Sequence, residues 1–367
     1  MTIGIVGAGQ LGRMLALAGF PLGLDFLFLD HSADTPAGRI APLLPGEFHD
    51  ETLLAELARR SDVISFDWEN ISVEALRRAA HGTRIAPPLK ALSVAQDRLA
   101  EKRCFQRLSI PTTRFAAVDS RVSLSHAVDR VGLPGVLKTR RFGYDGKGQY
   151  VLRSRADVGP AWNALGSAPL LYEEFVPFEY EVSIIGVRAR SGEIVVYPLN
   201  RNYHVDGILR LTLAPWAAPQ LARAAQGSLR KLLEHFNYVG VLTIEFFVHR
   251  GRLLANEMAP RVHNSGHWTI EGAVTSQFEN HVRAIAGLPL GATSPRGHSA
   301  MINLIGTMPE ARRFLAEPGL HWHDYRKEPR HGRKLGHCTI NESTASRRTA
   351  RAKQLLPRLY PQLALRP

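Results

Sequence analysis

The chain has 367 residues, 45% of them hydrophobic and 22% charged, which excludes a largely disordered protein and predicts two or three domains. Lys and Arg exceed Asp and Glu by 13, but no zinc-finger, basic-zipper or RNA-recognition signature accompanies this surplus, so we expect no nucleic-acid binding. The sequence contains no apolar run of membrane-spanning length, no secretory signal and only two widely separated cysteines. We therefore expect a cytoplasmic protein without a membrane span, a disulfide or a structural zinc site.

The first part of the chain, residues 1–97, is predicted to form an α/β domain. Short apolar strands alternate in it with helical segments, at residues 3–6, 11–18, 25–29, 53–60 and 62–66. This order is typical of βαβ units, in which the strands form a parallel sheet.

Residues 98–290 mix strands and helices without strict alternation, which indicates an α+β domain. Its predicted elements are strands at 135–138, 170–175 and 180–186, a helix over 221–236, and a hairpin of 241–248 and 252–257. Residues 291–367 form a small third part with a strand at 301–305. From residue 343 onward its tail has six Lys and Arg but no Asp or Glu, and we expect a solvated helix face there.

A glycine-rich turn follows the first strand. Gly7 to Gly12 match GxGxxG, and Asp30 ends the second strand at the distance expected of a ribose ligand. One interpretation is a dinucleotide site, because the amides and the helix dipole at such a turn favour phosphate. The other is a tight turn in a parallel α/β domain that binds no dinucleotide. The motif alone does not decide between them.

A second glycine-rich segment, residues 142–149, follows the strand that ends at Lys138. Its three glycines allow the backbone to close over phosphates, and Lys138 and Lys147 add positive charge. A surface hairpin with a basic tip is the alternative. We favour phosphate binding.

Two glutamates interrupt the apolar hairpin. A hairpin centred on Gly251 places Glu245 opposite Glu257, with Asn256 beside them. Two facing carboxylates repel each other unless a cation lies between them, and oxygen ligands suit Mg²⁺. The alternative is that Glu245 points to solvent, since a shift of one residue in the register reverses its direction.

A polar segment, residues 261–268, follows the hairpin directly. Its histidines have no cysteine or third histidine at zinc-ligand spacing, so a loop that binds a small polar substrate is favoured. The last cluster is basic and could be either a phosphate clamp or ordinary surface: Lys327, Arg330, Arg333 and Lys334.

Taken together, these motifs make the chain resemble the N5-carboxyaminoimidazole ribonucleotide synthetase family of ATP-grasp enzymes in purine biosynthesis. The segments that carry the resemblance run in family order from residue 4 to about 340. They are GIVGAGQLGRML from Gly4, QDR from Gln96, GYDGKGQ from Gly143, EEFVPFEYEVS from Glu173, NRNYHVDGIL from Asn200, YVGVLTIEFF from Tyr238, NEMAPRVHNSGHWTIEG from Asn256 and GRKLGH from Gly332.

The resemblance implies a combined α/β and α+β architecture: a Rossmann-like (pre-ATP-grasp) domain over 1–97, an ATP-grasp domain over 98–290 and a small β-rich C-terminal domain over 291–367. It implies a homodimer and no NAD or biotin. It also implies that bicarbonate and 5-aminoimidazole ribonucleotide are joined at the expense of ATP, with carboxyphosphate as the intermediate and Mg²⁺ as the metal.

The resemblance also implies roles for individual residues. Those implied for ATP are Arg98, Lys138, Gly143, Tyr144, Asp145, Gly146, Lys147, Gly148, Gln149, Glu173, Glu174, Phe175, Val176, Glu181, His204, Asn256 and Glu257. Those implied for the ribonucleotide are Gly9, Gln10, Leu11, Tyr144, Asp145, Lys147, Lys327 and Arg333. Asp145, Lys147, His263 and Asn264 are implied as catalytic, and Glu245 and Glu257 as metal ligands.

One position departs from the family pattern: Phe142 stands where the family usually has glycine. The aromatic side chain is expected to stiffen the loop or narrow the entrance to the nucleotide site. Three alternative classes remain: another ATP-grasp ligase such as formate-dependent glycinamide ribonucleotide transformylase or biotin carboxylase, an NAD-dependent oxidoreductase, and a nucleic-acid-binding protein.

Overall fold

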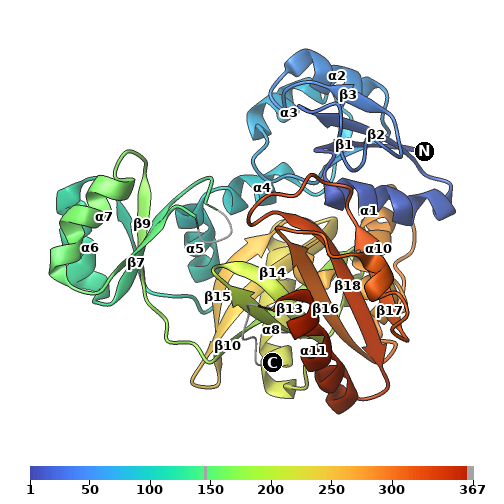
Figure 1. Cartoon of the computed structure of the whole chain (residues 1–367). Helices are drawn as coiled ribbons and strands as arrows, with labels where there is room; N and C mark the ends of the chain where they lie inside the picture. The colour runs from blue at the N-terminus through green and yellow to red at the C-terminus, as the bar shows by residue number, and fades with distance from the viewer. Residues whose placement is uncertain (144–146, 362–367) are drawn as a thin grey trace.

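The computed structural model describes residues 1–143 and 147–361 and is built around three sheets (Figure 1). The N-terminal sheet is parallel, with the strand order β3-β2-β1-β4-β5. Its strands are β1 (Thr2–Val6), β2 (Asp25–Asp30), β3 (Leu43–Pro45), β4 (Val63–Phe66) and β5 (Arg84–Ile85). Its helices are α1 (Gln10–Gly19), α2 (Glu51–Arg59) and α3 (Val73–Ala79). The predicted parallel α/β arrangement is confirmed.

Two helices lead out of this domain: α4 (Leu89–Ala95) and α5 (Arg98–Arg107). Asp97 caps α5, because its carboxylate accepts hydrogen bonds from the N–H groups of Leu99 and Ala100. Asp97 also pairs with Arg140. The start of α5 is therefore fixed to the segment that precedes the second glycine-rich loop.

A small antiparallel sheet follows, with the order β6-β9-β7-β8. Its elements are β6 (Phe115–Val118), α6 (Arg121–Val131), β7 (Gly135–Thr139), β8 (Gln149–Leu152), α7 (Val158–Leu165) and β9 (Leu170–Glu174). Helices α6 and α7 cover one side of this sheet, and their apolar side chains form its core. This unit stands apart from the rest of the molecule and joins it near α5 (Figure 1).

The large sheet has nine strands in the order β15-β14-β10-β12-β13-β16-β18-β17, with β11 paired to β10. Its central part contains β10 (Tyr180–Arg188), β11 (Ile194–Val196), β12 (Asn200–Val205), β13 (Ile208–Ala214), β14 (Gly240–His249) and β15 (Arg252–Ala259). Helix α8 (Pro219–His235) packs against β10 and β14. Helix α10 (Gln277–Ala286) packs against α1 and shares one apolar core with it, which unites the N-terminal domain with the large sheet.

The C-terminal strands continue the same sheet, because β16 pairs with β13. They are β16 (His298–Ile305), β17 (Leu320–Asp324) and β18 (Lys334–Glu342), and helix α11 (Ala345–Leu359) covers them. The short helix α9 (Thr269–Gly272) lies between the polar segment 261–268 and α10. The β-rich character predicted for this part is confirmed.

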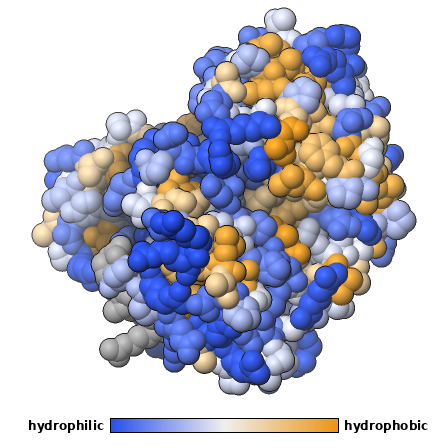
Figure 2. All heavy atoms as spheres, turned by 45° about the vertical axis from the view of Figure 1, so that its right-hand side comes forward, coloured by the Kyte–Doolittle hydropathy of each residue, from blue (hydrophilic) through white to orange (hydrophobic). Residues whose placement is uncertain are grey.

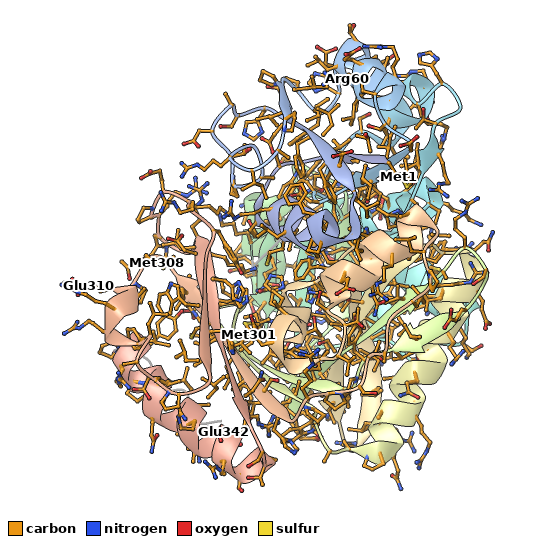
Figure 3. All side chains as sticks on the ribbon, turned by 90° about the vertical axis from the view of Figure 1, so that its right-hand side faces the viewer. Met1, Arg60, Met301, Met308, Glu310 and Glu342 are labelled. Atoms are coloured by element: carbon orange, nitrogen blue, oxygen red, sulfur yellow. The ribbon has the colours of Figure 1, made fainter. Side chains whose placement is uncertain are left out.

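The basic tail differs from the solvated helix face that we predicted. Arg348 is only 2% exposed and donates a hydrogen bond to the carbonyl of Pro215. Arg351 pairs with Glu317 and Glu342. Acidic residues earlier in the sequence therefore neutralise part of the tail, which a local charge count cannot detect. Glu342 lies at the opposite end of the molecule from Arg60 of the N-terminal domain (Figure 3).

Candidate active site

The two predicted metal ligands face each other, but not for the reason that the sequence suggested. The turn of the hairpin is Arg250–Gly251, both with positive φ, so that His249 faces Arg252 and Phe246 faces Ala255. A β-bulge then shifts the register by one residue and places Glu257 opposite Glu245. The predicted pairing is confirmed, whereas the predicted centre of the hairpin is wrong.

The two carboxylates have different charged neighbours, so their pKa values shift in opposite directions. Burial, together with the charges of Glu257 and Glu181, raises the pKa of Glu245 to about 8, although His204 opposes this rise. Burial also favours a higher pKa for Glu257, but Arg98 and Lys138 outweigh it and lower that pKa. Arg98 Nη1 lies 3.2 Å from Glu257 Oε2. The pair thus holds a proton more readily on Glu245 than on Glu257.

The donor set at this pair fits a hard divalent cation. Glu245 and Glu257 offer carboxylate oxygens, and Asn256 Oδ1 is buried without a hydrogen-bond partner in the described part of the chain. A buried polar atom without a partner is unfavourable unless a ligand satisfies it. Across residues 1–143 and 147–361, no group of three or more His, Cys, Asp or Glu is placed to hold a metal alone. A cation here needs further oxygens from a bound molecule, as Mg²⁺ on nucleotide phosphates does.

Cationic side chains approach the carboxylate pair from the small sheet and from α5. Lys138 Nζ, at the end of β7, lies 2.9 Å from Glu173 Oε2 of β9. Arg98 Nη2 donates a hydrogen bond to the carbonyl of Gly143. The predicted ATP residues Arg98, Lys138, Glu173 and Glu257 are therefore close together, although β7, β9, α5 and β15 are far apart in the sequence.

Histidines border the carboxylate pair on its other side. Ser265 N–H donates to His263 Nδ1, which places the proton of the neutral ring on Nε2, 3.4 Å from Glu245 Oε1. Burial and the charge of Arg261 keep the pKa of His263 well below its usual value, so the ring is neutral at neutral pH. His204 Nδ1 lies 2.7 Å from Glu181 Oε2. Asn264, also predicted as catalytic, has a buried amide nitrogen without a hydrogen-bond partner in the described residues.

The second glycine-rich loop is described only at its two ends. The predicted residues Tyr144, Asp145 and Gly146 lie outside the described residues. Lys147 and Gln149 are exposed, and Gly148 has a φ of +69° with its carbonyl accepting a hydrogen bond from Thr139 N–H. A Cβ at Gly148 would approach Thr139 Oγ1 to 2.6 Å, so both the backbone conformation and the space require glycine there.

Phe142 has a φ of +62°, in the region that favours glycine, and its side chain is 72% exposed. Both Phe142→Gly and Phe142→Ala remove the aromatic ring, but only glycine relieves the backbone conformation. We expect the glycine variant to be more stable than the alanine variant by about 1 kcal/mol. A higher midpoint of thermal unfolding for Phe142→Gly checks this, and an alanine variant of equal or greater stability would contradict it.

Glu174 and Phe175, two of the residues implied for ATP, already use their backbone N–H groups. The N–H groups of Glu174 and Phe175 donate to the carbonyls of Arg114 and Pro134. These two amides are therefore already satisfied within the protein. The Glu174 carboxylate pairs with the largely exposed Arg114.

The GxGxxG turn uses its amides within the domain. Gly9 and Gly12 N–H donate to Asp67 Oδ2 at 2.8 and 3.0 Å, and Ala8 N–H donates to Asp30 Oδ2 at 2.8 Å. Asp30 and Asp67 thus occupy amides of the turn that the dinucleotide interpretation assigns to phosphate, and Asp30, the expected ribose ligand, is itself bonded to the turn. Asp67 is not among the predicted site residues, although its place directly after the buried strand β4 is a usable signal.

The C-terminal part reaches the same turn. Lys327 Nζ donates to Gln10 Oε1 at 2.9 Å, which brings two of the predicted ribonucleotide residues into contact across the domains. Burial and the charge of Arg333 lower the pKa of Lys327 to about 8. Arg333 itself donates to the carbonyl of Glu328. A second pair that we did not predict joins the N-terminal domain to the central domain, because Arg261 Nε lies 3.0 Å from Glu69 Oε1.

Comparisons with known proteins decide the family. The N5-carboxyaminoimidazole ribonucleotide synthase of Pseudomonas aeruginosa is 48% identical over 353 residues, covering 96% of this chain and 97% of that protein. The chain belongs to the N5-carboxyaminoimidazole ribonucleotide synthase family. Three domain families match in order: the ribonucleotide synthetase preATP-grasp domain over 1–96, the ATP-grasp domain over 103–278 and the phosphoribosylaminoimidazole carboxylase C-terminal domain over 299–351.

Solved structures of the family agree with this fold. The N5-carboxyaminoimidazole ribonucleotide synthetase of Thermus thermophilus has 50% identity and a TM-score of 0.94, covering 99% of this chain and all of that one. The synthase of Aspergillus clavatus, solved with ADP and 5-aminoimidazole ribonucleotide, has 30% identity and a TM-score of 0.89, with 97% of both chains covered. The three-part architecture implied by the resemblance is therefore confirmed.

Proposed function

We propose that this chain carboxylates 5-aminoimidazole ribonucleotide with bicarbonate and ATP, producing N5-carboxyaminoimidazole ribonucleotide, ADP and phosphate in purine biosynthesis. The observation that carries the proposal is the facing pair Glu245 and Glu257, with Arg98 on one carboxylate and His263 near the other. Names and ligands of the relatives support this choice of substrates over those of other ATP-grasp ligases.

The ATP phosphates are proposed to bind between α5, the small sheet and β15. Arg98 and Lys138 lie there, where Arg98 forms an ion pair with Glu257 and Lys138 forms one with Glu173. The second glycine-rich loop is proposed to close over the phosphates. Enzymes with an ATP-grasp domain use ATP with a divalent metal, and Glu245, Glu257 and Asn256 would hold Mg²⁺. When bound, the metal supplies charge neutralisation for the transferred phosphoryl group.

The chemistry begins with an attack of a bicarbonate oxygen on the γ-phosphorus. This attack forms carboxyphosphate and releases ADP. Both reactants are anions, so Arg98 and Lys138 are proposed to lower the repulsion between them. The exocyclic amine then attacks the carboxyl carbon, or CO₂ released from it. The bond between that carbon and the phosphate oxygen breaks, and the proton lost from the amine is taken up by the departing phosphate. His263 and Asn264 are proposed to meet the bicarbonate, with the Nε2 proton of His263 available as a hydrogen-bond donor.

The ribonucleotide is proposed to bind between the GxGxxG turn and the C-terminal part. Gln10 and Lys327 meet there, and Arg333 lies close enough to lower the pKa of Lys327. Leu11 and the backbone of Gly9 are proposed to line the part of this ribonucleotide site nearest to α1. The N–H of Gly9 already donates a hydrogen bond to Asp67. Tyr144, Asp145 and Lys147 are proposed to reach the same substrate from the loop.

Phosphate release tests this function against its alternatives. With ATP, Mg²⁺ and bicarbonate present, 5-aminoimidazole ribonucleotide should stimulate phosphate release. Glycinamide ribonucleotide with formate, biotin and NAD should each leave the rate unchanged. An unchanged rate with saturating 5-aminoimidazole ribonucleotide would contradict the proposal.

The ionisation of Lys327 predicts a pH dependence. With a pKa of about 8 the ammonium group is present at pH 7 but only about one tenth protonated at pH 9. The value of kcat/KM for the ribonucleotide should therefore fall as pH rises through 8, because the free enzyme loses a charge that attracts phosphate. The Lys327→Arg variant keeps its positive charge over this range. Its kcat/KM for the ribonucleotide should therefore fall about tenfold less between pH 7 and pH 9 than that of the unchanged chain. Parallel pH profiles for the two proteins would contradict this role.

The resemblance further implies a cytoplasmic homodimer, which we include in the proposal. Apolar side chains gather on part of the face shown in Figure 2, and the exposed hydrophobic residues in and near α1 and α10 include Leu17, Phe20, Val274 and Leu288. Light scattering of the purified chain tests the dimer. Among the described residues, no helix has the length and apolar character needed to cross a bilayer.

A further inference from the structure

Two neighbouring charged residues of α5 are almost completely buried: Glu101 is 2% exposed and Lys102 is 1% exposed. Neither residue belongs to the proposed substrate or metal contacts. Burial and the nearby charge of Glu257 raise the pKa of Glu101 to about 8, and burial lowers the pKa of Lys102. Buried charges are unfavourable unless their partners compensate them, so the partners of these two residues indicate what they do.

Both residues bind the outer edge of β15 on either side of its bulge. Lys102 Nζ donates to the carbonyl of Ala255 at 3.0 Å, and Glu101 Oε1 accepts the N–H of Met258 at 2.6 Å. The two residues between these contacts are Asn256 and Glu257. β15 is an edge strand of the large sheet, and on its outer side Ala255 also pairs with the segment before β6: its N–H donates to the carbonyl of Pro111, and its carbonyl accepts from Thr112 Oγ1 at 2.7 Å. Lys102 therefore adds to these contacts at Ala255, and Glu101 holds Met258 on the other side of the bulge.

The bulge determines where the Glu257 carboxylate points. Phe246 faces Ala255, so a regular ladder would continue with Asn256 opposite Glu245 and would turn Glu257 to the other face. The extra residue in β15 instead brings Glu257 opposite Glu245. Contacts that hold Ala255 and Met258 therefore also hold the position of the proposed metal ligand.

Lys102 makes a second connection, toward the phosphate-binding cations. Its ammonium group lies 3.5 Å from Glu173 Oε1, and the other oxygen of Glu173 holds Lys138. Thr112 and Thr113 hydroxyls accept further hydrogen bonds from Lys102. Lys102 thus links β15 of the large sheet with β9 and β7 of the small sheet.

We propose that Glu101 and Lys102 are positioning residues that hold the β15 bulge, and with it Glu257, in register with Glu173 and Lys138. They touch no substrate in this scheme. They set the affinity for Mg²⁺ and ATP by fixing the groups that bind them. This inference rests on the proposed roles of Glu257 and Lys138.

A matched pair of variants at position 101 tests the first contact. Glu101→Gln keeps an oxygen that can accept the Met258 N–H, whereas Glu101→Leu has similar bulk and no acceptor. Calorimetry of ADP binding over a series of Mg²⁺ concentrations is the measurement. Residues that orient metal ligands typically change metal affinity by about 10–100-fold when lost. We expect Glu101→Leu to need about tenfold more Mg²⁺ for half-maximal binding, and Glu101→Gln to stay within about threefold of the unchanged chain.

Lys102→Met tests the second contact, with Lys90→Met on the exposed surface of α4 as its control. We expect Lys102→Met to weaken ADP binding about tenfold while the KM for 5-aminoimidazole ribonucleotide stays within about threefold. If Lys102 had a merely structural role, its loss would weaken the binding of ADP and of the ribonucleotide alike. If Glu101→Leu does not fold, the comparison of Lys102→Met with its control decides.

Folded Glu101→Leu and Lys102→Met proteins with unchanged Mg²⁺ and ADP affinity would overturn the inference. The proposed function is judged separately, by ADP binding and ribonucleotide-stimulated turnover of the unchanged chain. The two failures are therefore distinguishable, because a failure of the proposed function appears in the unchanged chain, whereas a failure of this inference appears only in the variants.

Discussion

Glu257→Gln should lower kcat/KM for ATP by about 100-fold or more, whereas Glu174→Gln should change it by less than about threefold. The amide keeps the shape of Glu257 but removes the charge proposed to hold Mg²⁺, and it leaves the charge of Arg98 without its partner. Glu174 is the matched control because its carboxylate pairs with the 69%-exposed Arg114. Exposed ion pairs contribute about 0–1 kcal/mol.

Initial rates over a range of ATP concentrations provide the measurement, repeated at several Mg²⁺ concentrations. Partial recovery of Glu257→Gln at high Mg²⁺ is expected if the variant binds the metal more weakly. Equal losses in the two variants would show that Glu257 has no special part in binding Mg·ATP.

Lys327→Ala should raise the KM for 5-aminoimidazole ribonucleotide by roughly 10–100-fold and leave the KM for ATP nearly unchanged. A charge-assisted contact to phosphate is worth about 1.5–3 kcal/mol, and every 1.4 kcal/mol is a factor of ten. Gln10, the present partner of Lys327, is a neutral side chain, so the ammonium charge is not cancelled by that contact. Saturation curves for both substrates check this prediction.

The control for Lys327→Ala comes from the basic helix α11. Arg351 is unsuitable because it pairs with Glu317 and Glu342, so its removal affects stability. Lys353 is exposed on the same helix, and most surface substitutions change stability by less than about 0.5 kcal/mol. Lys353→Ala should change neither KM. A Lys327→Ala protein that loses affinity for ATP and ribonucleotide together would argue against a specific contact.

The sequence predicted the parts of the site that depend on local pattern. The strand, glycine loop and Lys138 follow one another in the chain, and a hairpin needs only two apolar strands and a turn. The pairing of Glu245 with Glu257 was predicted correctly, although the predicted centre of the hairpin at Gly251 is wrong. The two-residue turn shifts the register by one residue relative to that centre, and the bulge shifts it back. A bulge leaves no reliable mark in a single sequence.

Contacts between distant segments were not predictable in the same way. Nothing near the GxGxxG turn indicates that Asp67, more than 50 residues later, occupies its amides. The burial of Lys102 was not predicted, because it depends on β15 and β9 packing around the side chain. Local charge counting also missed the acidic partners of Arg351.

Oxygen transfer from bicarbonate to phosphate tests the central claim most directly. The chain is incubated with ATP, Mg²⁺ and freshly dissolved ¹⁸O-bicarbonate, with and without 5-aminoimidazole ribonucleotide, and the released phosphate is analysed by mass spectrometry. Attack of a bicarbonate oxygen on the γ-phosphorus predicts one ¹⁸O in each phosphate released in the ribonucleotide-dependent reaction. Phosphate that carries only solvent oxygen, or phosphate release that does not respond to the ribonucleotide, would contradict a carboxylation driven through carboxyphosphate.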